Sequence, residues 1–252
     1  MSGDGGGFGV RWRDVAPEAG WFDPFFEPMF ALASAHLGRM ASTGAKILHL
    51  GCGSGDKTEA LRRMGFVATG VDVDEPLLEL ATRKYPGCAF VRASAEALPF
   101  EGGSFDAAFS FSVLQLVDHE RVMSECHRVL RPGGRAVFIE NLHGSPLALG
   151  YRFMHRVLGS SYRQNETPRS YVRWTTRSDL VSLFREASFA AFHLTTPLGL
   201  VLPTLGQHFF HIPIHARSGP LHRLMSRLDQ SLFERAPPTR KLAWGLVACL
   251  IK

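Results

Sequence analysis

The stretch that decides the fold is Leu48-His49-Leu50-Gly51-Cys52-Gly53-Ser54-Gly55, an apolar run that passes into three alternating glycines. The run at 46–50 predicts a strand, and the segment at 57–64 predicts a helix that begins after the glycines. Glycines at such a turn let the backbone approach a ligand, and the first amides of the following helix point at it. This stretch therefore predicts an α/β fold with a small-molecule site at the end of the first strand.

Short apolar runs alternate with helical segments as far as residue 140, a pattern typical of a parallel sheet with right-handed crossovers. Strands are expected at 46–50, 66–72, 88–92, 105–111 and 135–140, and helices at 57–64, about 76–84 and 120–130. Beyond residue 140 the expected elements are an irregular and helical segment at 141–174, a helix at 177–187, a strand at 189–195, leucines at helical spacing over 221–233 and a final strand within 242–251.

The charge of the chain is divided unequally along its length. The 252 residues carry a net charge of +5, but residues 1–140 hold 14 basic and 18 acidic side chains, whereas residues 141–252 hold 14 and 5. The basic second half indicates an acidic substrate, a membrane surface or nucleic acid as its partner. Because the first half is acidic, a broad nucleic-acid footprint is disfavoured.

The cysteines and the apolar runs limit the class of protein further. Cys52, Cys88, Cys126 and Cys249 are widely separated, so neither a zinc site nor a disulfide framework is indicated, and a reducing cytoplasm fits best. The longest apolar stretch, 194–214, contains three prolines and two histidines, which a lipid-exposed span would not tolerate. No signal peptide or transmembrane segment is expected, and peripheral contact with a membrane stays open.

Two ligand classes compete for the glycine loop. A dinucleotide fingerprint requires a small residue at the position of Asp56, so a nicotinamide-dependent oxidoreductase is the weaker interpretation. About twenty residues after the loop, Asp72 ends the second strand, where a carboxylate can accept both hydroxyls of a ribose. A strand-end aspartate can instead cap a helix, but Asp74, just before Pro76, suits that role better.

Four segments in this order resemble class I S-adenosylmethionine-dependent methyltransferases of the methyltransferase-11 type, which include quinone-biosynthesis enzymes. They are LHLGCGSG (48–55), GVDVDEPLLELA (70–81), ASAEALPFEGGSFDAAFSFSVLQLV (93–117) and HRVLRPGGRAVFIE (127–140). The resemblance implies S-adenosyl-L-methionine as cofactor and S-adenosyl-L-homocysteine as its product. It implies a Rossmann-like sheet of about seven mostly parallel strands, the last antiparallel, with helices on both faces.

The same resemblance assigns cofactor contacts. The glycine loop, with Gly51, Cys52, Gly53 and Gly55, is expected to contact the methionine and sugar portions, and Asp72 the ribose. The residues expected around the adenine and along the methionine are Val73, Ser94, Ala95, Phe111 and Ser112. Residues 131–134 (Arg-Pro-Gly-Gly) are expected to form a structural turn into the fifth strand.

Two positions depart from the family pattern. His49 stands where the family usually has an acidic residue that steadies the glycine loop and the amino group of the cofactor, and Ser94 stands where an aspartate commonly accepts from the adenine. Serine can still accept that hydrogen bond, and a neutral histidine nitrogen either donates or accepts. Weaker cofactor binding is one expectation; a non-catalytic cofactor-binding homologue is the alternative.

The architecture is expected to form one domain over 1–252. Residues 44–140 form its cofactor-binding half, segments 141–174 and 198–240 form an acceptor cap after the fifth strand, and residues 1–10 are disordered. The cap interleaves arginines with aromatic residues, which indicates an anionic or hydrophobic small-molecule acceptor.

The predicted reaction is an in-line methyl transfer without a metal. The preferred acceptor is an oxygen of a natural product or glycan-like molecule. His143, three residues beyond the fifth strand, and His211 are the candidate bases. His208, His211 and His215 have spacings that metal ligands can share, but Pro213 interrupts the turn, so a lid is favoured over a metal site. Nitrogen or carbon methylation of a quinone-like acceptor remains an alternative, and the oligomeric state is left open.

Overall fold

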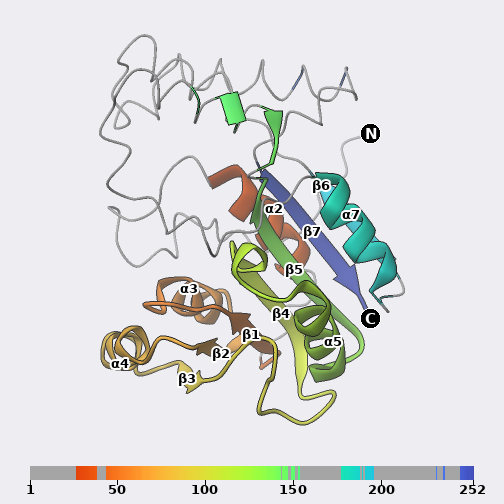
Figure 1. Ribbon diagram of the computed structural model, residues 1–252. Coiled ribbons are helices and arrows are strands. Elements are labelled where there is room, and N and C mark those ends of the chain that lie inside the picture. The colour runs from red at the N-terminus through yellow and green to blue at the C-terminus, as the bar shows by residue number, and fades with distance from the viewer. Residues whose placement is uncertain are drawn as a thin grey trace, which may run out of the picture.

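The computed structural model describes residues 27–38, 44–142, 144–146, 149–150, 153, 177–187, 189, 191–195, 231, 235 and 245–252. Within this part of the chain, a seven-stranded sheet has the order β3-β2-β1-β4-β5-β7-β6 (Figure 1). The strands are β1 (Lys46–Leu50), β2 (Val67–Asp72), β3 (Ala89–Arg92), β4 (Phe105–Phe111), β5 (Leu130–Asn141), β6 (Ala191–Thr195) and β7 (Gly245–Ile251). The first five strands are parallel, and β7 pairs antiparallel with β5 and β6. The predicted Rossmann-like α/β class with a mostly parallel sheet is confirmed.

Helices pack against both faces of this sheet. They are α2 (Glu27–Gly38), α3 (Asp56–Arg63), α4 (Glu75–Lys84), α5 (His119–Val129) and α7 (Arg177–Glu186), with a 3₁₀ turn, η1, at Leu114–Leu116. Most lie within a residue or two of their predicted bounds. Helix α2 was not predicted, because its apolar residues are spread around the helix instead of along one face.

The fifth strand differs from its prediction. It begins at Leu130, five residues before the expected start, so residues 131–134 belong to the strand and do not precede it as a turn. Its register with β4 shifts between Phe105 and Ala107, and Gly133 has a φ of 74°. The Gly133 amide donates to the Lys252 carbonyl at 2.8 Å. The proline and glycines therefore form an irregular strand start that pairs with the end of the chain.

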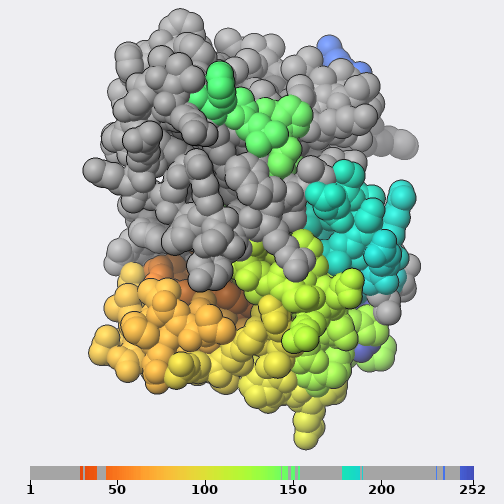
Figure 2. Space-filling model, viewed as in Figure 1, coloured from red at the N-terminus to blue at the C-terminus, as the bar shows by residue number. Residues whose placement is uncertain are grey.

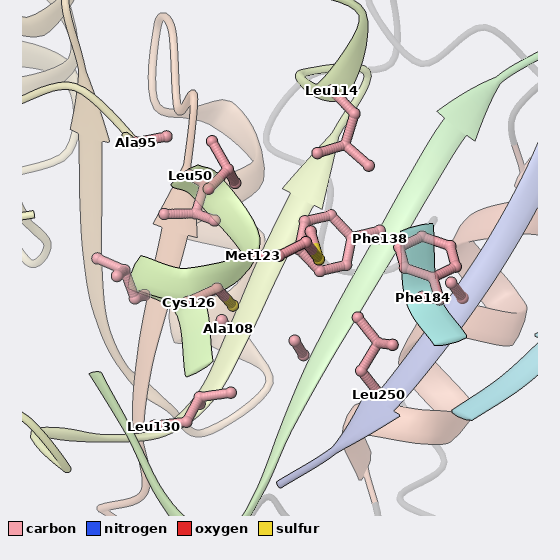
Figure 3. Close-up of a cluster of buried hydrophobic side chains, with 14 of the residues drawn as sticks. Leu50, Ala95, Ala108, Leu114, Met123, Cys126, Leu130, Phe138, Phe184 and Leu250 are labelled. Atoms are coloured by element: carbon pink, nitrogen blue, oxygen red, sulfur yellow. The ribbon is translucent and has the colours of Figure 1, made fainter. Parts of the chain in front are cut away.

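Alternation along the strands divides the core into two layers. In β1, Leu48 and Leu50 are buried on the face covered by α5 and α7, and Ile47 on the face covered by α2 and α3. In the first layer, Phe138 of β5 faces Phe184 of α7, with ring centroids 6.1 Å apart (Figure 3). Both faces of the central strands β1, β4, β5 and β7 are therefore largely buried, which explains why these strands are mostly apolar runs.

Parallel pairing brings the carboxyl ends of β1, β2, β3 and β4 to one edge of the sheet. The helices that follow β1 and β2 begin at this edge, and the Asp74 side chain accepts from the Leu77 amide at 3.0 Å to cap α4, as predicted. In the space-filling view, α3 and α4 form one side of the described surface and α7 lies at the other side (Figure 2). The segments predicted as disordered (1–10) or as the cap (141–174 and 198–240) fall almost wholly outside the described residues.

Candidate functional site

The glycine loop between β1 and α3 has a conformation that requires glycine. Gly51 and Gly53 have φ values of 65° and 50°, in the left-handed region that other residues adopt only at a cost. A Cβ on Gly51 would lie 2.4 Å from Val113 Cγ2, whereas a Cβ on Gly53 would meet no atom of the described residues within 4 Å. Gly51 is thus required by close packing, and Gly53 faces open space that a ligand can occupy.

Asp72, at the end of β2, is connected to this loop. Its Oδ2 accepts the Gly53 amide at 2.8 Å, and its Oδ1 accepts the Asp74 amide at 3.0 Å. A carboxylate has about four acceptor sites, so each oxygen of this partly buried group retains capacity for another donor. The arrangement suits a carboxylate that orients the loop and also accepts the two hydroxyls of a ribose.

His49 lies beneath the glycine loop, not in the open site. Its ring is 1% exposed, its Nδ1 is 2.8 Å from Thr58 Oγ1, and its centroid is 5.2 Å from that of Phe109. Burial, with the nearby Lys57 ammonium as a second cause, lowers the His49 pKa to about 3. The neutral ring joins β1 to the first turn of α3 and so spans the glycine loop, which is consistent with a steadying role rather than direct contact with a ligand.

Lys57, which was not among the predicted site residues, lies on the same face of the sheet as His49. Burial lowers its pKa to about 8, and its Nζ lies 4.5 Å from the centroid of the Phe111 ring. The same ring stacks on Phe30 of α2 at 5.1 Å. Phe111 was expected to lie along the methionine of the cofactor, and its described contacts are with α2 and α3.

The residues expected around an adenine follow β2 and β3. Val73 is 64% exposed directly after Asp72. Ser94 Oγ accepts the Glu96 amide at 3.1 Å, within a turn in which Ala95 is buried. A hydroxyl oxygen has two lone pairs, so Ser94 retains the capacity to accept from a base. The exposed apolar side chain and the nearby acceptor have the chemistry that a purine requires.

The loop after β4 reaches the same edge through Ser112, whose φ is 55°. Glu140, at the end of β5, is 2% exposed, and its Oε1 accepts the amides of Val113 at 3.2 Å and Leu114 at 3.3 Å. Burial raises the Glu140 pKa to about 8, although these backbone bonds favour the charged form. Sequence reasoning missed Glu140; an acidic residue closing the apolar run 136–139 was the available signal.

Two of the predicted site residues lie outside the described part of the chain. These are the candidate bases His143 and His211; His208 and His215, considered as metal ligands, lie outside it too. Among the residues that are described, no group of three or more His, Cys, Asp or Glu side chains is arranged to hold a metal ion. No described helix combines the length and apolarity needed to cross a membrane.

Comparison with known proteins agrees with this geometry. Residues 48–138 match the model of the methyltransferase domain family. The chain is 34% identical over 170 residues to a demethylmenaquinone methyltransferase of Lactococcus lactis, covering 59% of this chain and 67% of the relative. It is 29% identical over 180 residues to a ubiquinone biosynthesis O-methyltransferase of Pseudomonas aeruginosa, covering 68% and 74%.

The fold has matches among solved structures. An S-adenosylmethionine-dependent methyltransferase from Mesorhizobium loti superimposes with a TM-score of 0.57 and 20% identity, covering 90% of this chain and 98% of that chain. The fold and the site define a Rossmann-like enzyme that binds a nucleoside cofactor. The chain belongs to the S-adenosylmethionine-dependent methyltransferases, and S-adenosylmethionine is its cofactor. The nicotinamide alternative is therefore set aside.

The described residues fit this cofactor. The open space beside Gly53, the Asp72 carboxylate and the exposed Val73 lie at one edge of the sheet. This edge therefore offers room, an acceptor for hydroxyl groups and an apolar surface, which a nucleoside with an amino-acid tail requires. S-adenosylmethionine contains no pyrophosphate, so its site needs no cationic side chain to bind one. Asp56, which disfavoured a dinucleotide, accepts Lys84 Nζ at 3.0 Å and takes hydrogen bonds from Ser54 and Tyr85.

Proposed function

We propose that this enzyme transfers a methyl group to the oxygen of a small or medium organic molecule and that hydroxylated, quinone-like rings are the first acceptor class to test. The observation that carries this proposal is the intact cofactor edge, in which the Gly53 amide and the Asp72 carboxylate are 2.8 Å apart beside open space. Similarity to an enzyme named as a ubiquinone biosynthesis O-methyltransferase supports oxygen as the acceptor atom. Similarity to demethylmenaquinone methyltransferases supports the quinone-like ring.

In this proposal, S-adenosylmethionine supplies an activated methyl group when bound, and the protein supplies alignment. Asp72 holds the ribose and the glycine loop together. His49 and Thr58 steady that loop from below, because their 2.8 Å contact joins the two elements on either side of it. A hydroxyl acceptor must lose a proton, and we assign that base role to His143, with His211 as the second candidate.

We further propose that residues 44–140 form the cofactor half of a single domain over 1–252, and that segments 141–174 and 198–240 form the acceptor cap. The net charge of residues 141–252, from 14 basic and 5 acidic side chains, suits an acceptor that is anionic or carried on an anionic group. An apolar acceptor would also fit the aromatic residues of the first cap segment, with peripheral contact to a membrane. We place the protein in the cytoplasm, since its four cysteines are free thiols.

The test has two stages. Calorimetry with S-adenosylhomocysteine and with NADH first separates the cofactor classes; we expect the former alone to bind. The enzyme is then incubated with S-adenosylmethionine and matched acceptors, such as a hydroquinone, its aniline analogue and its methyl-blocked ether. Formation of S-adenosylhomocysteine with the hydroquinone alone, and a methyl ether identified by mass and NMR, supports oxygen transfer. Methylation of the aniline or of ring carbon would reject it, and tight cofactor binding without transfer to any acceptor favours the non-catalytic alternative.

A further inference from the structure

The end of β5 holds the loop that follows β4, here called the post-β4 loop (112–114). The Ile139 carbonyl accepts the Ser112 amide at 2.8 Å. The next side chain, Glu140, places Oε1 3.2 Å from the Val113 amide and 3.3 Å from the Leu114 amide. Consecutive residues of one strand thus satisfy every amide of this loop.

The loop needs such support because Ser112 is held in an unfavourable conformation. Its φ of 55° is the only positive φ of a non-glycine residue in the described part of the chain. A left-handed conformation at an L-residue costs free energy and persists only where the surroundings enforce it. Asn141 adds to that enforcement, since its Nδ2 donates to Ser112 Oγ at 2.8 Å.

The post-β4 loop is also in contact with the glycine loop. Val113 Cγ2 occupies the position that a side chain on Gly51 would need, with 2.4 Å separating it from an ideal Cβ there. Any displacement of Val113 therefore changes the surface against which the backbone of Gly51 rests. Gly51 is the first residue of the loop to which the cofactor is assigned.

The chemical nature of Glu140 suits a fixing role. The side chains of Val113 and Leu114 are buried, and a buried amide without an acceptor is costly. A single carboxyl oxygen accepts both amides, so the loop cannot shift without breaking one of these bonds. An apolar residue at position 140 would fill the space but leave both donors without this acceptor.

We propose that Glu140 is a positioning residue for methyl transfer. It fixes the post-β4 loop and, through Val113, holds the glycine loop in the conformation that binds the cofactor. This inference rests on the proposed placement of the cofactor at the glycine loop. Glu140 acts through the backbone and does not itself contact the reacting atoms.

The experiment compares Glu140→Leu, which removes the acceptor, with Glu140→Gln, which keeps an acceptor oxygen of the same length. The control is Asp106→Leu. Asp106 lies at the opposite end of β4, where its Oδ2 accepts the Lys46 amide at 2.6 Å. Asp106 Oδ1 also pairs with Arg131 Nε at 2.8 Å. This variant therefore loses a carboxylate-to-backbone bond and an ion pair in the same sheet, but far from the carboxyl edge, so it perturbs the sheet at least as strongly as Glu140→Leu. Each full-length variant is titrated with S-adenosylhomocysteine by calorimetry and unfolded in urea.

We expect Glu140→Leu to weaken S-adenosylhomocysteine binding about tenfold or more, with Glu140→Gln within about threefold of the wild type and Asp106→Leu within about twofold. The kcat of Glu140→Leu with saturating cofactor should also fall, while that of Glu140→Gln recovers. Equal binding by a folded Glu140→Leu would overturn the proposal, as would an equal loss in Asp106→Leu. A wild type that does not bind S-adenosylhomocysteine would instead refute the proposed function.

Should Glu140→Leu fail to fold, Asn141→Ala tests whether cofactor binding depends on the fixed conformation of the post-β4 loop, through which Glu140 is proposed to act. Asn141 is only partly buried, so its removal leaves the core intact and deletes a single support of Ser112. About threefold weaker binding of S-adenosylhomocysteine with an unchanged urea midpoint supports the proposal. Unchanged binding overturns it.

Discussion

The Gly53 amide donates a 2.8 Å hydrogen bond to Asp72 Oδ2, so the carboxylate assigned to the ribose also holds the glycine loop. The two residues lie 19 positions apart, Gly53 in the loop after β1 and Asp72 at the end of β2. With the ribose placed on Asp72 as proposed, its binding and the shape of the loop are coupled. A substitution at Asp72 should affect both the ligand contact and the surface that receives the rest of the cofactor.

Replacement of Asp72 by alanine tests this coupling. We expect Asp72→Ala to weaken S-adenosylhomocysteine binding by about 1.5–3 kcal/mol, which is about tenfold or more, because charged hydrogen bonds to two hydroxyls are lost. Asp74→Ala is the matched control. It removes the α4 cap and should cost about 1 kcal/mol of unfolding free energy while leaving affinity within about twofold. Calorimetry on both variants decides; unchanged affinity in Asp72→Ala would exclude the ribose role.

The two glycines of the loop should respond differently to alanine. Gly51→Ala places a Cβ 2.4 Å from Val113 in addition to its backbone strain, so its unfolding free energy should fall by more than that of Gly53→Ala. Gly53→Ala should lose only about 1–2 kcal/mol, from its φ of 50°. Its methyl group enters the open space, and we therefore expect about tenfold weaker S-adenosylhomocysteine binding. Urea unfolding and calorimetry measure the two effects; normal binding by Gly53→Ala would place the ligand elsewhere.

Glu140 should make the folded state less stable as the pH rises. Its pKa is raised from 4.5 to about 8 by burial, so the folded state retains a proton that the unfolded state releases. Its contribution is complete below pH 4.5 and is lost as the pH passes through the folded pKa, at about 1.4 kcal/mol per pH unit. Relative to Glu140→Gln, the wild type should lose stability between pH 6.5 and 8. Parallel stability curves for the two proteins over that range would contradict the assignment.

His49 should have the opposite effect at acid pH. Burial lowers its pKa from 6.5 to about 3, so the unfolded state binds a proton that the folded state excludes. Stability is present above pH 6.5 and falls, at about 1.4 kcal/mol per pH unit, as the pH decreases toward 3. His49→Gln should lack this acid loss while keeping a polar partner for Thr58. Urea unfolding of the wild type and variant at pH 6.5 and pH 5 compares them, and an identical acid loss in both would show that His49 is not the group responsible.

The proposed base gives a prediction for the pH profile of the reaction. With a hydroxyl acceptor, kcat should increase with pH on its acidic limb, because only the deprotonated base can accept the proton of the acceptor. His143→Ala should lower kcat about 10²–10⁴-fold and abolish that acidic limb. His127→Ala, which removes a histidine packed on Phe189 at 5.2 Å, serves as the control. An acidic limb that survives in His143→Ala and disappears in His211→Ala would transfer the role to His211.

Much of the cofactor edge could be predicted from local sequence. Glycines at positions 51, 53 and 55 indicated a loop with backbone dihedral angles that other residues rarely adopt. All three glycines have positive φ. The cap role of Asp74 followed from its place before Pro76, because helix starts have strong local preferences. These features depend on neighbours in the chain, which a single sequence displays.

Other features could not be predicted in this way. Helix α2 has no one-sided apolar pattern, since its residues contact both the sheet and neighbouring segments. The buried neutral state of His49 depends on Thr58 and Phe109 closing over its ring, and a sequence does not state which faces become dry. The contact of the Phe111 ring with Phe30, 81 positions earlier in the chain, likewise depends on how α2 packs on the sheet.

By itself, the sequence determined the family, the alternation of strands and helices, and the glycine loop with its strand-end carboxylate, because each is a short-range pattern of side-chain type and backbone freedom. Only the tertiary structure decided that Asp72 binds the Gly53 amide, that Glu140 holds the post-β4 loop and that β7 lies between β5 and β6. The physical reason is that buried polar groups must find partners after the sheet has assembled. Those partners lie far apart in the chain, and only strand pairing brings them within hydrogen-bond distance.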